Sequence, residues 1–199
     1  MTAEAAPQPD QGILLAAIED DLRQSLADLE PLRSHGLVDM IRYHLGWSVS
    51  SPSSRGKRVR PLLTLLSCES AGGDWRKALP AASAVELIHN FSLVHDDIED
   101  GSESRRGRPT VWKKWGVPQA LNAGDAIFTL ARLSTHRLLA SNVEPQAVLN
   151  VQHVLDRACL MLTLGQHLDL AFECLQSVTE DDYFAMIEGK TSSLLAAAT

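Results

Sequence analysis

Apolar residues recur at helical spacing along most of this chain, and that period limits the possible fold more than any other feature. In the segment 84–98 the apolar side chains follow the 3.6-residue period of one helical face as far as Gly101. The segments 15–29 and 37–45 repeat the pattern, and no segment shows the sustained alternation of a strand. The sequence therefore predicts an all-α bundle of helices packed around one core.

Turn and capping residues set the ends of the later helices. A loop is expected to reach about Pro109, and helices are expected over residues 118–140 and from 145 to about 174. The last helix is predicted to start at Thr179, because Asp182 stands in the capping-box position three residues later.

The chain reads as one domain with a short tail. Residues 1–10 are polar and contain two prolines, which favours a disordered tail, and residues 11–199 show no repeat, low-complexity tract or internal boundary. No leader and no run of about 18 apolar residues occurs, so we expect neither export nor a membrane span. Three widely spaced cysteines without a CxxC pair favour reduced thiols, and together these features predict a cytoplasmic protein.

Charge is unevenly distributed. The net charge of −7 gives the whole protein no attraction for nucleic acid or anionic lipid. Nine of the eighteen Lys and Arg residues nevertheless lie in the two short segments 55–60 and 105–114. Two local basic patches in an acidic protein indicate small anionic ligands.

Three aspartates lie at the C-terminal end of the helix that stops at Gly101. Asp96 and Asp100 are four residues apart and share one helical face, with Asp97 beside them. Their charges repel one another and oppose the helix dipole, so cations should neutralise them. Mg²⁺ prefers carboxylate oxygens and leaves positions open for phosphate oxygens. For this spacing alone, a solvated acidic helix end is the alternative.

Basic residues follow and precede this aspartate cluster. Arg105 and Arg106 come within ten residues of Asp96, and guanidinium groups bind phosphate oxygens in a bidentate way. The segment 56–61 places a second basic patch at the start of a helix, where free N–H groups favour an anion. The pattern predicts two separate phosphate sites, one of them supported by metal ions.

The chain resembles the trans-type isoprenyl diphosphate synthases, known as the polyprenyl synthetase family. Six matching motifs occur in family order over most of residues 37–199. They are GKRVRP at 56–61, ELIHNFSLVHDDIED at 86–100, RRGRPT at 105–110, NAGDAIF at 122–128, GQHLDL at 165–170 and GKTS at 189–192. The resemblance implies an isoprenoid synthase-type helical bundle around a central cavity.

The resemblance also implies a role for individual residues. It implies that Mg²⁺ is bound by Asp96, Asp97 and Asp100, and that the allylic diphosphate is bound by Arg105, Gln166, Asp169, Lys190 and Thr191. Arg105, Gln166 and Lys190 are the implied catalytic residues. It implies that isopentenyl diphosphate is bound by Lys57, Arg60, His89 and Arg106, and that product chain length depends on Phe91 and Ser92.

Each of these residues has a plainer interpretation when taken singly. His89 could be a core histidine, Gln166 and Asp169 could form a buried polar contact, and Lys190 could lie at an exposed helix end. Phe91 could be an ordinary packing residue. The order of the motifs favours the functional interpretation.

The implied reaction is the trans, head-to-tail condensation of isopentenyl diphosphate with an allylic diphosphate. Phe91 is five residues before Asp96, which places it about 7.5 Å from Asp96 along the helix axis. A large aromatic side chain at this position resembles the residue that limits product length in short-chain members of the family. We therefore expect a product of about C15 to C20, geranylgeranyl diphosphate first. A homodimer is implied as well.

The family's second aspartate-rich motif does not occur in these 199 residues. We therefore expect the N-terminal portion of a synthase whose C-terminal helices are missing, with its activity alone in question. A non-catalytic subunit or binding module of a heteromeric synthase and a terpene cyclase are the alternatives.

Overall fold

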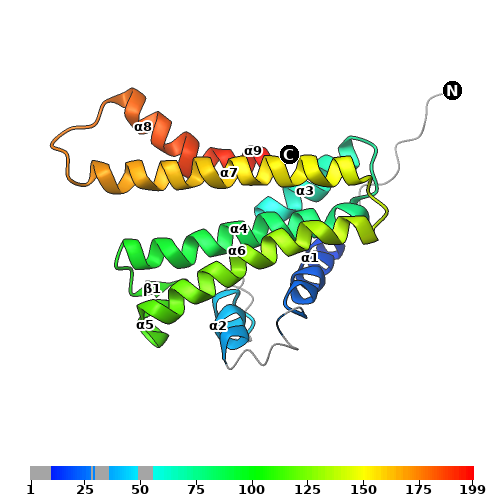
Figure 1. Cartoon of the computed structure of the whole chain (residues 1–199), viewed down its shortest axis with the longest axis horizontal. Helices are drawn as coiled ribbons and strands as arrows, with labels where there is room; N and C mark the ends of the chain where they lie inside the picture. The colour runs from blue at the N-terminus through cyan, green and yellow to red at the C-terminus, as the bar shows by residue number, and fades with distance from the viewer. Residues whose placement is uncertain (1–9, 28, 30–35, 49–55) are drawn as a thin grey trace.

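A long and largely buried helix forms the centre of the fold. In the computed structural model, which describes residues 10–27, 29, 36–48 and 56–199, α4 (Leu79–Glu99) is buried continuously over residues 82–88. A helix buried on all sides must be enclosed by other elements. α6 (Val117–Ala140) runs back along α4, and the two helices form the middle layer of the molecule (Figure 1).

The C-terminal segments form a layer on one side of this pair. α7 (Pro145–Phe172) is followed by α8 (Glu180–Ile187), the π-helical turn η4 (Glu188–Ser192) and α9 (Ser193–Ala197). Figure 1 shows these last three elements returning along α7. The returning segment brings η4 next to the C-terminal half of α4.

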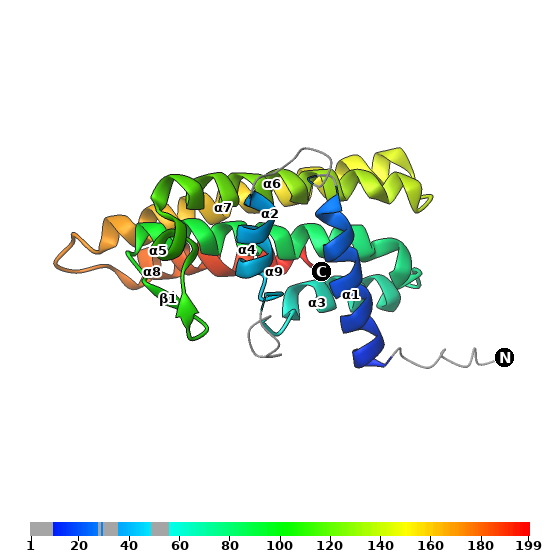
Figure 2. The same ribbon diagram turned by 90° about the horizontal axis from the view of Figure 1, so that it is seen from below.

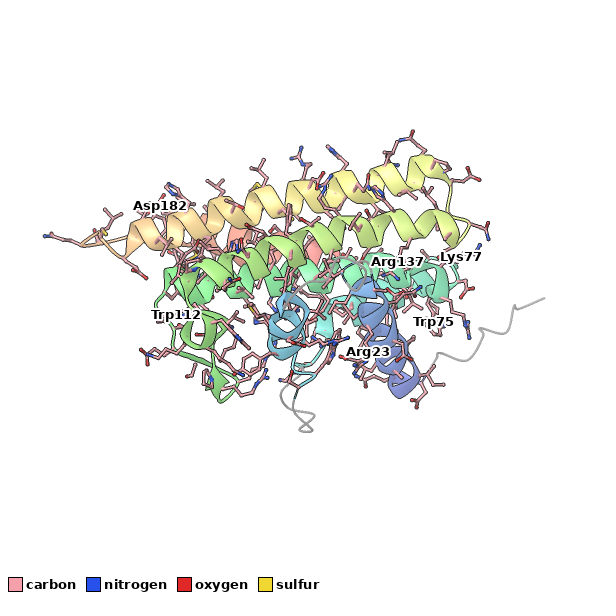
Figure 3. All side chains as sticks on the ribbon, turned by 60° about the horizontal axis from the view of Figure 1, so that its bottom comes forward. Arg23, Trp75, Lys77, Trp112, Arg137 and Asp182 are labelled. Atoms are coloured by element: carbon pink, nitrogen blue, oxygen red, sulfur yellow. The ribbon has the colours of Figure 1, made fainter. Side chains whose placement is uncertain are left out.

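The N-terminal helices cover the other side. α1 (Gln11–Ser25) and α2 (Leu37–His44) lie across α4 and α6 (Figure 2), whereas α3 (Val59–Ser70) packs against α4. η3 (Trp75–Ala78) leads into α4. Arg137, labelled in Figure 3, extends from α6 to α1 and donates two hydrogen bonds to the carboxylate of Asp21 at 2.7 and 2.9 Å. Ser83 of α4 donates to the same carboxylate at 2.6 Å, so one polar cluster joins three helices.

The all-α prediction is confirmed, with local differences from the expected elements. The predicted loop before Pro109 contains a hairpin of β1 (Ser104–Arg105) and β2 (Arg108–Pro109). α5 (Val111–Trp115) follows it. Strands of two residues are too short to give an alternating pattern, which explains why the sequence did not indicate them.

The ends of the last segment also differ from expectation. The predicted cap is present, because Thr179 Oγ1 accepts a hydrogen bond from the backbone N–H of Asp182 (labelled in Figure 3) at 3.2 Å. The helix that begins there is interrupted by η4, which the sequence did not indicate. Residues 1–9 of the predicted tail lie outside the described residues, whereas Asp10 is described and caps α1.

The structure also bears on membrane spans and on the cysteines. No helix of the described residues is long and apolar enough to cross a membrane. Cys68, Cys159 and Cys174 form no disulfide in the structure, and Cys159 is buried while Cys174 is exposed.

Candidate functional site

The aspartates at the end of α4 are paired with cations from two other elements. Arg105 of the hairpin donates its Nε–H to Asp97 Oδ1 at 2.9 Å and an Nη2–H to Asp96 Oδ2 at 3.2 Å. The hairpin turns through Arg106 and Gly107, both at positive φ, and this tight reversal brings Arg105 back over the helix end. Of the two neighbouring arginines, Arg105 is therefore the one that pairs with the aspartates, whereas Arg106 lies against Gly56.

Lys190 of η4 forms the second cationic contact. Its Nζ lies 3.3 Å from Asp96 Oδ1 and 2.5 Å from Asp169 Oδ2 of α7. Burial tends to lower the pKa of Lys190, but the carboxylates of Asp169 and Asp96 outweigh burial and raise it. Lys190 is therefore a charged donor held between two carboxylates and not an exposed helix end.

A contact between two glycines places Lys190 in this position. A Cβ added to Gly165 of α7 would lie 2.1 Å from the backbone N of Lys190, and one added to Gly189 would lie 2.7 Å from the backbone O of Met161. The two backbones thus touch where η4 crosses α7. Single π-turns inside helices occur often at functional sites, and this one turns Lys190 toward Asp96.

Negative charge remains concentrated at the helix end. Burial raises the pKa of Asp97, and the nearby charges of Asp96 and Asp100 add to this effect while Arg105 opposes it. Burial and Asp96 also raise the pKa of Asp100. The buried Oδ2 of Asp97 has no hydrogen-bond partner among the described residues.

These carboxylates suit a hard divalent cation such as Mg²⁺. Among the described residues, no three His, Cys, Asp or Glu side chains are arranged to hold one metal ion by themselves. Mg²⁺ is commonly held by one or two carboxylates together with substrate phosphates and waters, so Asp96, Asp97 and Asp100 fit an ion that arrives with an anionic ligand. Repulsion among the three aspartates is the feature that such an ion would relieve.

A cavity of about 270 Å³ opens beside Asp96 and Lys190. Its wall is polar near these residues and apolar at Phe91. The ring of Phe91 packs against that of Phe128, with 5.0 Å between the two ring centroids. Eight of the predicted site residues line this cavity: Arg60, His89, Phe91, Ser92, Asp96, Gln166, Lys190 and Thr191. Arg60 Nε and Gln166 Nε2 are buried there without a hydrogen-bond partner among the described residues, so both can donate to a ligand.

A second cavity, of about 180 Å³, is lined by basic residues. It holds all four residues that were predicted to bind isopentenyl diphosphate: Lys57, Arg60, His89 and Arg106. A Cβ added to Gly56 would lie 2.7 Å from an Nη atom of Arg106, so the two basic motifs meet at this glycine. Arg60 and His89 line both cavities, which therefore share a wall.

Cationic side chains outnumber carboxylates in the lining of the basic cavity. Burial, followed by the charges of Arg60 and Arg106, lowers the pKa of His89 to about 3. Burial also lowers the pKa of Arg60. The charges of Arg60 and Arg106, which oppose protonation of His89, would attract an anion in this cavity.

Arg58 is a residue of this region that sequence reasoning missed. Arg58 is the N-cap residue that precedes α3 and has φ 51°. This left-handed conformation turns its side chain inward while Lys57 stays exposed. Its guanidinium donates to Glu86 at 2.7 Å and to Glu19 at 2.7 Å. Arg58 thus neutralises Glu86, a buried acid that lines the basic cavity. The sequence GKRVRP at 56–61 shows a cation at this position, but no local pattern indicates whether the side chain of Arg58 points inward or outward.

Acid is expected to destabilise the fold through His44, which is buried, and His89, which is partly buried. Burial, followed by the charge of Arg106, lowers the pKa of His44 to about 3, like that of His89, from an ordinary value of 6.5. Below pH 6.5 the unfolded chain therefore binds two protons that the folded chain does not. The free energy of unfolding should fall by about 1.4 kcal/mol per pH unit for each histidine.

Urea unfolding between about pH 7 and about pH 5 measures this slope. His44→Gln should remove one histidine's share of it. His153→Gln, at an exposed position, should keep the wild-type slope. Equal slopes for wild type and His44→Gln would contradict the prediction.

The chain is similar to known proteins in both sequence and structure. The sequence profile of the family described as Polyprenyl synthetase matches residues 47–199. A (2E,6E)-farnesyl diphosphate synthase of Mycobacterium bovis is 39% identical over 207 residues, which cover 96% of this chain and 55% of that protein. A geranylgeranyl diphosphate synthase of Methanosarcina mazei is 46% identical over 143 residues, which cover 72% of this chain and 43% of that protein.

The fold is also similar to that of a solved prenyl diphosphate synthase. The crystal structure of the geranylgeranyl pyrophosphate synthetase from Pyrococcus horikoshii matches with a TM-score of 0.81 and 38% sequence identity, covering 94% of this chain and 55% of that one. The chain thus spans about half the length of the relatives that it matches.

Proposed function

This chain belongs to the polyprenyl synthetase family, and from that premise we propose that it carries the substrate sites of a trans-prenyltransferase. The proposed reaction joins isopentenyl diphosphate to an allylic diphosphate, head to tail. The observation that carries the proposal is the pair of adjoining cavities. The larger cavity is lined by carboxylates and Lys190 and has an apolar end, whereas the smaller cavity is lined mostly by basic side chains. Arg60 and His89 line both cavities.

The larger cavity suits the allylic substrate. Its diphosphate would lie between Arg105, Lys190 and the aspartates, and its hydrocarbon tail would extend toward Phe91. Gln166 and Thr191 would donate to the same diphosphate, with Asp169 holding Lys190 in place. Asp96, Asp97 and Asp100 would hold Mg²⁺, which when bound would supply positive charge that offsets the charge of the diphosphate.

The basic cavity suits isopentenyl diphosphate. Lys57, Arg60, His89 and Arg106 can together contact a diphosphate, and Arg58 keeps the carboxylate of Glu86 from repelling it. Because the cavities adjoin, the double bond of this substrate can reach the allylic carbon.

The chemistry requires no nucleophilic side chain. The allylic C–O bond breaks, the double bond of isopentenyl diphosphate attacks the allylic carbon, and a proton leaves the condensed product. Negative charge accumulates on the departing diphosphate, where Arg105 and Lys190 stabilise it through charged hydrogen bonds. The departing diphosphate is the proposed acceptor of the proton.

Phe91→Ala is expected to lengthen the product. We propose a product of about C15 to C20, geranylgeranyl diphosphate first, because the Phe91 ring narrows the apolar end of the larger cavity against Phe128. Removing the ring opens space for additional isoprene units, whereas the smaller Ser92 should matter less. Chromatography of labelled products measures chain length. Products of unchanged length would reject this role for Phe91.

The function is tested by incubating the chain with labelled isopentenyl diphosphate, Mg²⁺ and each allylic diphosphate in turn. Elongated product supports the proposal. Tight binding of both diphosphates without turnover would favour a non-catalytic subunit, and a cyclised hydrocarbon from one allylic substrate would favour a terpene cyclase. The homodimer stays a prediction, which light scattering of the chain in solution tests.

A further inference from the structure

Three buried polar atoms beside the aspartates have no hydrogen-bond partner among the described residues. They are Nε2 of His44, Oδ2 of Asp97 and Nε of Arg108. Other atoms of two of these side chains are engaged, because Asp97 Oδ1 accepts from Arg105 and Arg108 Nη1 donates to the carbonyl of Tyr43 at 2.9 Å. A buried polar atom without a partner costs about 1–3 kcal/mol, so three of them together call for a specific explanation.

All three side chains line the same small cavity. It has a volume of about 10 Å³ and lies between α2, the end of α4 and the hairpin. His44 and Asp97 are only 8% and 2% exposed. This volume is at the lower limit for a single water molecule, which also needs two to four polar partners.

The three atoms are chemically complementary to water. Arg108 Nε–H can only donate and the carboxylate oxygen of Asp97 can only accept, while the neutral ring of His44 offers either a donor or an acceptor at Nε2. A water molecule has two donors and two acceptors, so one molecule has enough of each for all three atoms.

We propose that an ordered water molecule occupies this cavity and links His44 and Arg108 to Asp97. The water accepts from Arg108 Nε–H and donates to Asp97 Oδ2, and its remaining hydrogen or lone pair serves His44 Nε2. Other occupants fit worse. Arg105, Arg106 and Arg108 line the cavity and repel a cation, while a phosphate is too large for it.

The linkage makes His44 and Arg108 positioning residues for Asp97. Arg105 holds one oxygen of this carboxylate, and the water holds the other, so its rotation about the Cβ–Cγ bond is fixed from both sides. Side chains that orient a metal-binding carboxylate in this way commonly change metal affinity by about 10–100-fold when they are altered. This consequence rests on the proposed function, whereas the water itself does not.

A high-resolution crystal structure of the chain tests the water directly. The expected result is an ordered water within hydrogen-bond distance of all three atoms. A direct contact between His44 Nε2 and Asp97 Oδ2, or a cavity without density for water, would overturn the proposal.

Binding of pyrophosphate in the presence of Mg²⁺ tests the positioning role. His44→Phe removes the ring nitrogens and should weaken this binding by about 10–100-fold. His44→Gln keeps a polar group and should recover most of it. In an Asp97→Asn background His44→Phe should add little, because its effect passes through Asp97.

Two results of this binding assay have distinct meanings. A full additional loss from His44→Phe in the Asp97→Asn background would reject the positioning role. Wild type that binds no pyrophosphate with Mg²⁺ would reject the proposed function instead, and the crystallographic result alone would then decide the water.

Discussion

Gly165→Ala is expected to separate η4 from α7 and to weaken magnesium-dependent diphosphate binding by about tenfold or more. The new Cβ would lie 2.1 Å from the backbone N of Lys190 and 2.7 Å from the backbone carbonyl carbon of Gly189. Neither backbone atom can rotate away as a side chain would, so the two elements must move apart. Overpacking of this kind costs typically about 1–3 kcal/mol.

The loss of binding follows from the displacement of Lys190. Its Nζ would leave Asp96 and Asp169, and a hydrogen bond to a charged group is worth about 1.5–3 kcal/mol, or about 10–150-fold in affinity. Isothermal titration with pyrophosphate and Mg²⁺ measures the affinity, and thermal unfolding measures the stability of the same variant.

Two controls separate a positioning effect from general damage. Leu164→Ala alters the neighbouring residue on α7, which is 48% exposed, and should leave binding unchanged. In a Lys190→Ala background, Gly165→Ala should weaken binding little further, although it should still lower stability. A folded Gly165→Ala variant that binds with wild-type affinity would contradict this role for the contact.

Arg58→Met should destabilise the fold by about 3–5 kcal/mol, because it leaves a buried carboxylate without its partner. Arg58 is 4% exposed and Glu86 is 3% exposed, and their N–O distance is 2.7 Å. Arg58 also donates to Glu19 and to the carbonyl of Leu45, so one side chain joins three segments. Urea unfolding with an unchanged m-value measures the loss.

Arg58→Met should also weaken anion binding in the basic cavity. Without Arg58, the carboxylate of Glu86 would attract Arg60, which must otherwise serve the anion. Isothermal titration with isopentenyl diphosphate measures this second effect.

A matched pair elsewhere in the chain provides the control. Arg76 and Asp74 also form an ion pair, at 3.4 Å, but both side chains are largely exposed, so Arg76→Met should change stability by no more than about 1 kcal/mol. The double variant Arg58→Met/Glu86→Met should recover part of the loss, since it removes the unpaired acid as well. Equal losses for Arg58→Met and Arg76→Met would argue against a buried network.

Much of the fold was predictable because helices are determined by neighbouring residues. The period over residues 84–98 and the stop at Gly101 place α4, and α4 does end at Glu99 with Asp100 as its cap. The cap at Thr179 was predictable for the same reason, because it depends only on Thr179 and on Asp182 three residues later. Short elements such as the hairpin and η4 escaped prediction because they involve too few residues to produce a period.

The candidate site was predictable to the extent that its residues cluster along the chain. Asp96, Asp97 and Arg105 lie within ten residues, so charge spacing alone indicated that they would meet, and they do. Lys190 was identified only through the resemblance to a family, because 94 residues separate it from Asp96. Its ion pair depends on the return of the chain along α7.

The sequence by itself determined the helices, the two basic motifs and the aspartate cluster, all of which depend on side chains within a few turns of one another. The tertiary structure alone decided that Arg58 points inward, that Gly165 meets Gly189, and that His44 and Asp97 line the same small cavity. The physical reason is the same in each case. Such contacts depend on backbone conformation and on the packing of segments distant in sequence, which no local spacing of residues specifies.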